Sequence, residues 1–308
     1  MARYLVTGGA GFIGSHLVDA LIERGAQVRA LDNLSTGRRA NLEHALTQIE
    51  FVEGDVRDGE AVCRAMQNVD YVLHQAALPS VQRSIADPLT TNEVNVGGTL
   101  NVLLAARDAK VKRVVMASSS SVYGDTPVLP KQEAMPAQPR SPYAVSKLAA
   151  ERYCLSFYEV YGLPTVALRY FNVFGPRQDP ESQYSAVIPR FIMALLKGEA
   201  PTIYGDGTQS RDFTFVANVV QANLLACERD AAIGKVMNVA CGARYTLLDL
   251  YAALARIVGT EIKPVLESPR PGDVKHSLAA IEVARQALGY EPAVGWLEGL
   301  RRTVEWYA

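Results

Sequence analysis

The stretch Thr7-Gly8-Gly9-Ala10-Gly11-Phe12-Ile13-Gly14 joins an apolar run, Arg3–Thr7, to an amphipathic one, Gly14–Arg24. Glycine permits a tight turn between a strand and a helix, and it lets the backbone come close to a pyrophosphate. The start of a helix adds unpaired N–H donors and the positive end of a dipole. Glycines at this spacing also suit an ordinary turn, but a strand before them and a helix after them favour a dinucleotide site.

An acidic residue follows the second predicted strand, Gln27–Leu31. Asp32 stands about 20 residues after the glycines, where a carboxylate can accept hydrogen bonds from an adenosine ribose. Its charge would repel a 2′-phosphate, so the sequence favours NAD over NADP, and Arg38 and Arg39 weaken this preference only slightly. The pair Asp55-Val56 follows a third strand, and it either flanks the adenine or caps a helix in a surface loop.

Short apolar runs alternate with amphipathic stretches as far as residue 170. The predicted strands are Arg3–Thr7, Gln27–Leu31, Ile49–Glu53, Tyr71–His74, Arg113–Ala117 and Thr165–Arg169. The predicted helices between them are Gly14–Arg24, Gly59–Met66, Asn92–Asp108 and Tyr143–Tyr161. This alternation indicates an α/β fold with a doubly wound parallel sheet of the Rossmann type, covered by helices on both faces.

The rhythm changes after residue 170, where glycine, proline and polar residues cluster and no second glycine signature occurs. The predicted helices are Ile188–Lys197, Val216–Ala226, Leu247–Val258, Ala279–Leu288 and Trp296–Trp306, and the predicted short strands are Phe213–Phe215 and Val236–Val239. We expect an NAD-binding Rossmann domain in residues 1–170, to which residues 213–240 return. A smaller mixed α/β lobe that binds substrate is expected in residues 171–212 and 241–308.

The composition argues against several classes of protein. Hydrophobic residues make up 49% of the 308 positions, too many for a disordered chain. Lys and Arg number 31 and Asp and Glu 32, so the basic excess typical of nucleic-acid or membrane-surface binding is missing. No run approaches the roughly 20 apolar residues of a membrane span. The four cysteines and four histidines are scattered, and no secretory signal is recognised, so we expect a metal-free cytoplasmic protein.

A tyrosine and a lysine lie one helical turn apart in Ser141-Pro142-Tyr143-Ala144-Val145-Ser146-Lys147. Residues i and i+4 share one face of a helix. A nearby ammonium, together with a cationic nicotinamide, favours the phenolate of Tyr143, which can take a proton from a hydroxyl while hydride leaves the same carbon. The same spacing also occurs where a buried tyrosine merely precedes a solvated lysine.

Four serines, Ser118-Ser119-Ser120-Ser121, follow the predicted strand Arg113–Ala117. The carboxyl end of a parallel strand is where ligands sit in an open α/β sheet. A serine hydroxyl there can pass a proton between a substrate and Tyr143, although serines also bend and cap the backbone without any chemical role.

Together these motifs resemble the extended short-chain dehydrogenase/reductase superfamily, and within it the UDP-sugar 4-epimerases of the UDP-glucose/UDP-N-acetylglucosamine type. The resemblance runs from Arg3 to about Trp306. Besides the glycine stretch and Tyr143-x-x-x-Lys147, it rests on Ser118-Ser119-Ser120-Ser121-Val122-Tyr123-Gly124, Leu168-Arg169-Tyr170-Phe171-Asn172-Val173-Phe174-Gly175-Pro176, Gly205-Asp206-Gly207-x-x-x-Arg211-Asp212 and Pro269-Arg270-Pro271-Gly272-Asp273.

The resemblance implies roles for particular residues. Ser119, three residues before Val122, matches the catalytic serine, although Ser118 and Ser120 are close enough to confuse the register; Tyr143 and Lys147 match the catalytic pair. NAD contacts are implied at Gly8, Gly11, Phe12, Ile13, Gly14, Asp32, Asn33, Asp55, Val56, Ala76, Asn95, Tyr143, Lys147 and Tyr170. UDP-sugar contacts are implied at Ser119, Ser120, Tyr143, Asn172, Val187, Tyr204, Arg211, Arg270, Asp273 and Ser277. Forked hydrogen bonds from Arg211 and Arg270 suit a diphosphate, although either arginine alone could form a surface ion pair.

The residues after Ser119 help to choose among the reactions of the superfamily. Its 4,6-dehydratases carry an Asp-Glu pair where Ser120 and Ser121 stand, and its decarboxylases carry a glutamate in the stretch that here runs from Ser118 to Gly124 without one. The resemblance therefore implies an isomerase, a UDP-hexose 4-epimerase that works through a transient 4-keto sugar and regenerates its bound NAD. The alternatives are a UDP-glucuronate 4-epimerase or decarboxylase, and a non-catalytic NAD-dependent sensor.

In the resembling epimerases, the residue four positions after Asp273 lies against the C2 substituent of the sugar. Ser277 is small, so its volume predicts that UDP-GlcNAc and UDP-GalNAc are accepted as well as UDP-Glc and UDP-Gal. Alternatively, Ser277 is only a helix N-cap. The resemblance also implies a homodimer, formed by the predicted helices Asn92–Asp108 and Tyr143–Tyr161, whose apolar stripes would otherwise be ordinary core.

Overall fold

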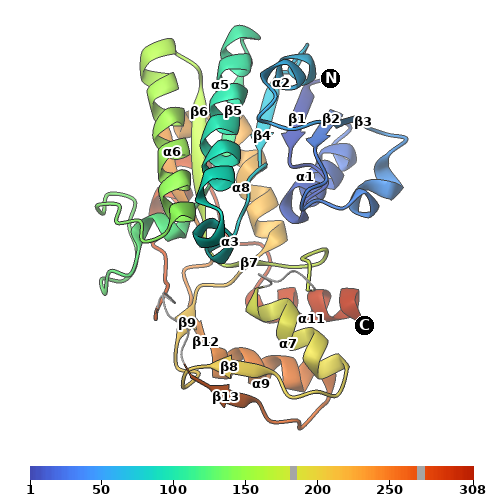
Figure 1. The fold of residues 1–308 in the computed structure, drawn as a ribbon, viewed down its shortest axis with the longest axis vertical. Coiled ribbons are helices and arrows are strands. Elements are labelled where there is room, and N and C mark those ends of the chain that lie inside the picture. The colour runs from blue at the N-terminus through green and yellow to red at the C-terminus, as the bar shows by residue number, and fades with distance from the viewer. Residues whose placement is uncertain (181–185, 269–274) are drawn as a thin grey trace.

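A seven-stranded parallel sheet organises the molecule, whose computed structural model describes residues 1–180, 186–268 and 275–308. Its strands are β1 (Arg3–Thr7), β2 (Gln27–Asp32), β3 (Glu50–Glu53), β4 (Tyr71–His74), β5 (Arg113–Ser119), β6 (Thr165–Tyr170) and β11 (Lys235–Val239). They lie side by side in the order β11-β6-β5-β4-β1-β2-β3 (Figure 1). Every neighbouring pair is parallel, which confirms the doubly wound sheet expected from the sequence.

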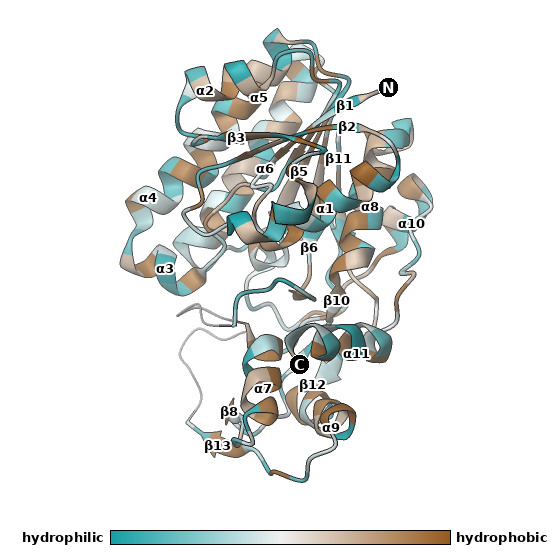
Figure 2. Ribbon diagram, turned by 90° about the vertical axis from the view of Figure 1, so that its right-hand side faces the viewer, coloured by the Kyte–Doolittle hydropathy of each residue, from teal (hydrophilic) through white to brown (hydrophobic). Residues whose placement is uncertain are grey.

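Successive residues of a central strand point to opposite faces of the sheet, and both faces are buried. In β5, Val114 and Met116 join the core on one face, whereas Val115 and Ala117 join the core on the other. A strand buried on both sides needs apolar residues at consecutive positions, which explains the unbroken run at the start of β5. The sheet strands are correspondingly hydrophobic along most of their length (Figure 2).

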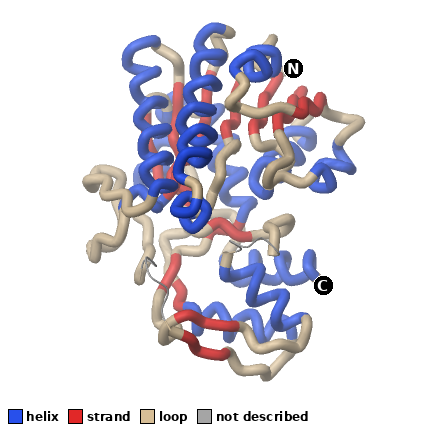
Figure 3. The backbone as a smooth tube through the Cα atoms, viewed as in Figure 1, coloured by secondary structure: helices blue, strands red, loops and turns tan. Residues whose placement is uncertain are grey.

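Helices cover both faces of the sheet (Figure 3). One face is covered by α2 (Gly59–Ala65), α5 (Gly98–Asp108) and α6 (Pro142–Tyr161). The other is covered by α1 (Phe12–Glu23), the 3-10 turn η1 (Arg39–Ala45), α8 (Val216–Glu228) and α10 (Glu282–Leu288). The helix after β1 and the helices after β4 lie on opposite faces, so a crevice opens at the carboxyl ends of these two neighbouring strands.

The long helix predicted at Asn92–Asp108 is interrupted. Helix α3 (Val81–Ala86) and helix α4 (Pro88–Asn92) come first, and a π-helical turn, η2 (Glu93–Gly97), joins α4 to α5. Gly98 starts α5 against Val56, where a Cβ atom would lie 2.6 Å from Val56 Cγ2. Close contact at this glycine holds α5 against the loop that follows β3.

The rest of the chain forms a smaller lobe below the carboxyl edge of the sheet (Figure 1). Its helices are α7 (Val187–Leu196), α9 (Leu247–Val258) and α11 (Trp296–Tyr307), which enclose a separate apolar core. Its short strands are β7 (Val173–Phe174), β8 (Thr202–Tyr204), β9 (Ser210–Arg211), β10 (Thr214–Phe215), β12 (Tyr245–Thr246) and β13 (Val265–Glu267). Strand β10 pairs with β7 and stays outside the main sheet, whereas β11 forms its edge beside β6.

Two sequence expectations are wrong in detail at residues 277–281. The helix predicted at Ala279–Leu288 begins only at Glu282, because the preceding residues pair with distant segments instead. Lys131 N–H donates to Leu278 O and Ala280 N–H donates to Lys131 O, at 2.7 and 2.9 Å. Ser277 consequently caps no helix, which removes the alternative interpretation of this residue.

Among the described residues, no helix combines the length and apolar character that crossing a membrane requires.

Candidate active site

The glycine turn lies at the head of the crevice. Gly8 has φ +69°, a conformation that favours glycine, and a Cβ atom there would lie 2.8 Å from Ala76 N. A Cβ atom at Gly14 would lie 2.0 Å from Gly8 O, so the turn and helix α1 touch. Gly11 is the N-cap of α1 and provides no side-chain acceptor. The first amides of α1, at Phe12 and Ile13, are therefore available to an anion, as a dinucleotide diphosphate requires.

Asp32 lies at the carboxyl end of β2, beside this turn. Its carboxylate accepts hydrogen bonds from Ala10 N at 2.9 Å and Leu34 N at 2.8 Å, and only 7% of the residue is exposed. Burial raises the pKa of Asp32, and the backbone donors oppose that rise. Arg38 pairs with Asp179 and Arg39 lies over the Phe51 ring. A carboxylate in this position fits a ribose diol and not a 2′-phosphate.

Asn33 and Asp55 connect the loops after β2 and β3. Asn33 Nδ2 donates to Asp55 Oδ2 at 2.8 Å, and Arg57 pairs with the same oxygen at 2.8 Å. The hydrogen bond from Arg57 lowers the pKa of Asp55 to about 2. Helix α2 is capped by Asp58, so the interpretation of Asp55 as a helix cap is wrong. The pair instead braces the two loops at the edge of the crevice, next to buried Val56.

Asn95 lies in the π-helical turn and is buried between the loop after β4 and the start of helix α6. Its Oδ1 accepts from Leu78 N at 2.8 Å, and its Nδ2 donates to Ser146 Oγ at 2.9 Å. Ser146 is the residue before Lys147. Asn95 therefore connects the loop after β4, which includes Ala76, to the start of helix α6.

Tyr143, Lys147 and Ser119 meet where α6 begins and β5 ends. The side chains of Ser119 and Tyr143 lie next to each other, and Lys147 Nζ donates to Ala117 O at 2.9 Å. Burial raises the pKa of Tyr143, and the neighbouring Ser119 hydroxyl opposes that rise. Burial also lowers the pKa of Lys147 to about 8. In the protein alone the phenol is thus favoured over the phenolate, and the phenolate expected from the sequence depends on the charge of a bound nicotinamide as well as on Lys147.

The alternation along β5 separates the four serines. Ser118 is buried and donates to Glu151 Oε2 at 2.8 Å, so its hydroxyl is engaged beneath the site. Ser119 is the next residue, and its hydroxyl accepts from Ser121 Oγ at 2.9 Å as well as meeting Tyr143. Ser120 begins a short 3-10 turn, η3 (Ser120–Tyr123). Of these serines, Ser119 is the one whose hydroxyl affects the pKa of Tyr143.

Tyr170 ends β6 and belongs to a polar cluster that sequence reasoning missed. Its hydroxyl donates to Gln75 Oε1 at 3.2 Å and accepts from Asn223 Nδ2 at 2.7 Å. Burial raises the pKa of Tyr170, so it stays a neutral phenol. Gln75 directly follows β4, and its position at a strand end was a usable signal. Asn223 lies within α8 and carried no signal, because only the fold brings that helix beside β6.

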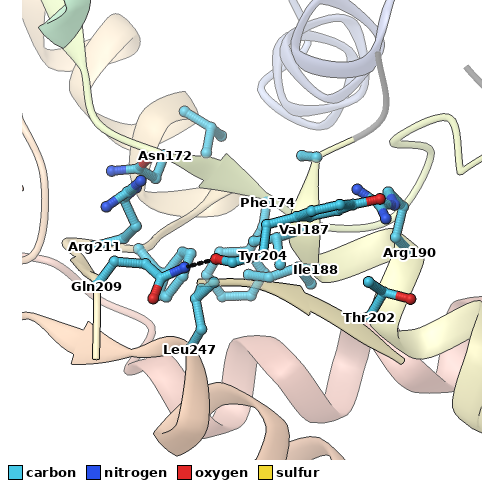
Figure 4. Close-up of a pocket in the computed structure, with 13 residues that line it drawn as sticks. Asn172, Phe174, Val187, Ile188, Arg190, Thr202, Tyr204, Gln209, Arg211 and Leu247 are labelled. Atoms are coloured by element: carbon cyan, nitrogen blue, oxygen red, sulfur yellow. Dashed lines mark hydrogen bonds between the residues drawn. The ribbon is translucent and has the colours of Figure 1, made fainter. Parts of the chain in front are cut away.

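The smaller lobe contains a cavity of about 280 Å³. Four residues predicted from the resemblance line it together, although they come from separate segments: Asn172, Val187, Tyr204 and Arg211. Arg211 and Asn172 lie at one side, and Arg190 lies at the other, with the Tyr204 ring extending toward it (Figure 4). Arg190 lies 5.5 Å from the Tyr204 ring centroid and was not predicted. The cavity therefore offers cations on two sides.

Ser277 lies beside this cavity. Asn172 Nδ2 donates to Ser277 Oγ at 3.4 Å, and Ser277 N–H donates to Ser210 O at 3.0 Å. The small side chain is thus adjacent to a cavity residue. Arg270 and Asp273, predicted as nucleotide contacts, lie outside the described residues. Among the residues that are described, no three or more His, Cys, Asp or Glu side chains gather as metal ligands.

Comparisons with known proteins agree with this geometry. Residues 4–240 match the NAD dependent epimerase/dehydratase family. A UDP-glucose 4-epimerase of Mycolicibacterium smegmatis is 41% identical over 309 residues, covering 99% of this chain and 98% of the relative.

Two solved structures are also similar along their whole length. One is a UDP-N-acetylglucosamine 4-epimerase from Methanobrevibacter ruminantium in complex with UDP-N-acetylmuramic acid, with 44% identity, a TM-score of 0.95 and coverage of 99% and 98% of the two chains. The other is a UDP-glucose 4-epimerase of Thermus thermophilus in complex with NAD, with 40% identity, a TM-score of 0.90 and the same coverage. With the glycine turn, Asp32 and the Ser119–Tyr143 contact in place, the protein belongs to the NAD dependent epimerase/dehydratase family.

Proposed function

We propose that the protein is an NAD-dependent UDP-hexose 4-epimerase. The observation that carries this proposal is the contact of Ser119 with Tyr143, one helical turn from buried Lys147, at the carboxyl edge of the sheet. The site contains groups that move a proton on and off a hydroxyl, and the stretch from Ser118 to Gly124 has no carboxylate to drive elimination or decarboxylation. Reversible oxidation at a single carbon fits these residues best.

Tyr143 is the proton acceptor in this proposal. It takes the proton of the C4 hydroxyl, directly or through Ser119, and it returns the proton when the carbonyl is reduced. Because burial raises the pKa of Tyr143, positive charge must be present for the phenolate to form near neutral pH. Lys147 provides one such charge. Bound NAD⁺ supplies a second charge and the hydride acceptor that C4 oxidation requires.

The residues that would hold NAD are those around the crevice. The free amides at the start of α1 suit the diphosphate, and the Asp32 carboxylate suits the adenosine ribose. Asn95 supports the loop after β4, and Tyr170 with Gln75 borders the same edge of the sheet. These donors and acceptors match a dinucleotide without a 2′-phosphate.

The cavity of the smaller lobe is the proposed place of the UDP group. Arg211 and Asn172 offer donors that suit a diphosphate, and Val187 and Tyr204 offer apolar and aromatic surface for a base. Arg270 and Asp273, which lie outside the described residues, complete the proposed group of UDP-binding residues. The uridine diphosphate would thus stay bound while the oxidised hexose turns and presents its other face.

Ser277 is the proposed determinant of the sugar. Its small volume beside Asn172 leaves room for an N-acetyl group, so we expect both plain and acetylated UDP-hexoses to be epimerised. A tyrosine at this position would occupy that room. Ser277→Tyr should therefore lower kcat/KM for UDP-GlcNAc by about tenfold or more relative to UDP-Glc, whereas Ser277→Ala should preserve the ratio. Equal losses for the two substrates in Ser277→Tyr would contradict the volume argument.

The test of the function itself is product analysis. Purified protein is given UDP-Glc and UDP-GlcNAc separately, with no added reductant, and the C4 epimers are resolved. The proposal expects UDP-Gal and UDP-GalNAc as products. Release of carbon dioxide, or a requirement for a uronate, would favour a UDP-glucuronate enzyme, and bound NAD without any product would favour a sensor.

We also propose a cytoplasmic homodimer formed through α5 and α6. The outer surface of α6 exposes Val145, Tyr153 and Val160, and Leu100 and Leu104 on α5 are only partly buried. The four cysteines are free thiols, which suits a reducing compartment. Sedimentation as a monomer at micromolar concentration would count against the dimer.

A further inference from the structure

A buried ion pair lies directly beneath the candidate catalytic residues. Glu151 on α6 has no exposed surface and Arg169 on β6 is 2% exposed. Their contact is forked, with Arg169 Nη2 at 2.7 Å from Oε1 and Nε at 2.9 Å from Oε2. Ser118 donates to the same Oε2 at 2.8 Å. One carboxylate therefore ties a helix to two neighbouring strands.

Glu151 and Ser118 are each close in sequence to a residue of the candidate site. Glu151 follows Lys147 by one helical turn, so both lie on the inward face of α6. Ser118 precedes Ser119, and because side chains alternate along a strand, holding Ser118 downward directs Ser119 the other way. With the Lys147 bond to Ala117 O, helix α6 is fastened to two consecutive residues of β5.

We infer that Glu151 and Arg169 are positioning residues of the reaction, which hold Ser119, Tyr143 and Lys147 in register. The inference rests on the proposed epimerase function. Neither side chain touches the reacting atoms. The pair acts by fixing the angle and height of α6 against the end of β5, and a displacement of a few tenths of an ångström there would lengthen the Ser119–Tyr143 contact.

Stability alone explains this arrangement poorly. A buried ion pair usually gains little over apolar side chains of the same volume, because both charges lose their water. Arg169 also leaves Nη1 buried without a hydrogen-bond partner, and its guanidinium is 4.7 Å from the Tyr123 ring centroid. The forked contact instead fixes the orientation of α6 relative to β6, since a planar guanidinium and a carboxylate fit together in one orientation.

The neighbouring strand β5 provides a matched control at its far end. Arg113 begins β5, is 5% exposed, and donates to Ala226 O, Arg229 O and Asp230 Oδ1 at 3.0, 2.9 and 2.7 Å. Its guanidinium is about as buried as that of Arg169 and makes at least as many hydrogen bonds, although its carboxylate partner Asp230 is exposed, and it lies away from the carboxyl ends of the strands. Arg169→Lys and Arg113→Lys therefore each remove a buried guanidinium, the first near the carboxyl ends of the parallel strands and the second near their amino ends.

The experiment compares these two variants with wild type. Thermal unfolding, the dissociation constant of UDP, kcat and KM are measured for each. Both variants should melt at lower temperature. Arg169→Lys should lower kcat by about tenfold or more with KM and UDP affinity within about threefold, whereas Arg113→Lys should keep kcat close to wild type. Equal kcat values in the two variants would overturn the inference, and so would a loss confined to UDP affinity.

A milder variant covers the case in which Arg169→Lys does not fold. Ser118→Ala removes a single hydroxyl from the network and leaves the ion pair, and it should lower kcat by several-fold without changing KM. Unchanged kcat in Ser118→Ala would contradict the role of this bond.

A readout that needs no turnover separates this inference from the proposed function. Backbone deuterium uptake over residues 117–121 should be faster in Arg169→Lys than in Arg113→Lys, measured in protein without substrate. If wild type epimerises no UDP-sugar but this difference is present, the proposed function fails, whereas the finding that the ion pair holds residues 117–121 in place stands. If wild type is active and uptake is equal in both variants, the positioning role fails alone.

Discussion

At the scale of single residues, the candidate site contains a buried ammonium, that of Lys147, which costs the folded protein stability. Lys147 is 7% exposed, and burial lowers its pKa to about 8 from an ordinary value near 10.5. At neutral pH the folded protein therefore holds an ammonium that water would solvate better. Its partner is the Ala117 carbonyl, and in the proposed mechanism its charge assists proton transfer at the tyrosine.

Lys147→Met should lower the activity of the protein and raise its stability. Turnover should fall by about 100-fold or more, while the free energy of unfolding at pH 7, from urea titration, should rise by about 3 kcal/mol. The folded-state pKa lies below the unfolded one, so the cost of burying the ammonium is present in full below about pH 8 and disappears as pH rises to 10.5. The stability gap between variant and wild type should close over that range, and a gap that does not depend on pH would contradict this origin.

His74 shows the opposite use of burial, because it stays neutral. Its Nδ1 lies 2.7 Å from Thr7 Oγ1 and its Nε2 lies 2.9 Å from Thr99 Oγ1. Thr99 donates its own hydroxyl proton to Asn95 O, so Nε2 must carry the imidazole proton. Burial, with the charge of Lys147, lowers the pKa of His74 to about 3.

His74→Gln should change how stability depends on pH. The unfolded chain takes up a proton at His74 below about pH 6.5, whereas the folded protein does not until about pH 3. Wild type should therefore lose about 1.4 kcal/mol per pH unit more than the variant between those values. The variant should be less stable at pH 7, and urea titrations at pH 7, 6 and 5 should show the difference shrinking. Parallel pH curves would exclude a buried neutral histidine.

Single residues were predictable from sequence when a strand end or a spacing marked them. Asp32 follows the predicted second strand directly, and Tyr143 and Lys147 share a helical turn, so position alone marked them as candidate site residues. Ser118 and Ser119 could be told apart only in three dimensions, because the partner that engages Ser118 lies 33 residues away. The same holds for Arg190, which is marked by no spacing and reaches the cavity only through the packing of the smaller lobe.

At the scale of elements, the turn between β1 and α1 depends on the absence of side chains. A Cβ atom at Gly14 would lie 2.0 Å from the carbonyl oxygen of Gly8, and backbone cannot retreat cheaply from such contact. Gly97, in the π-helical turn, has nothing within 4 Å of its own Cβ position. These two helical glycines form a natural pair for mutation.

Gly14→Ala should displace α1 from the turn and abolish NAD binding. It should lower the free energy of unfolding by about 2 kcal/mol or more, whereas Gly97→Ala should be neutral or raise it by up to about 1 kcal/mol. Calorimetric titration with NAD, together with urea unfolding, measures both effects. Normal NAD affinity in Gly14→Ala would show that the turn can relax around a methyl group.

The elements themselves were predictable where an apolar period was long. The start of β5 and most of α6 fall where the pattern placed them, because buried strands and amphipathic helices leave regular signatures. Two elements departed for physical reasons. The helix expected from Ala279 starts at Glu282 because Leu278 and Ala280 pair with Lys131, and the π-helical turn before α5 leaves no periodic trace.

At the scale of the whole molecule, the main sheet depends on a strand from late in the chain. Strand β6 is buried along its whole length, and β11 is the neighbour that covers its outer edge. Helix α8, which precedes β11, covers the adjacent part of the core with residues such as Val219 and Ala222. The near-neutral composition gave no sign of this arrangement, because net charge says nothing about chain topology.

A chain ended after residue 212 should therefore aggregate. It would keep six strands of the sheet but expose the unpaired edge of β6 and the apolar surface under α8. Size-exclusion chromatography should show it mainly as large species. A chain ended after residue 240 regains β11 and α8, and it should give a larger unaggregated fraction. A monodisperse 1–212 fragment would mean that the first six strands are sufficient by themselves.

The late arrival of β11 also has a consequence for folding on the ribosome. The glycine turn and six strands are synthesised well before residue 235, so β6 stays unpaired on its outer edge until β11 has been made. During that interval the nascent chain resembles an aggregation-prone intermediate, with an unpaired strand of high apolar content. A pause in translation between residues 171 and 234 would lengthen this exposure, whereas one close to the end of the chain would not, since the edge is by then closed.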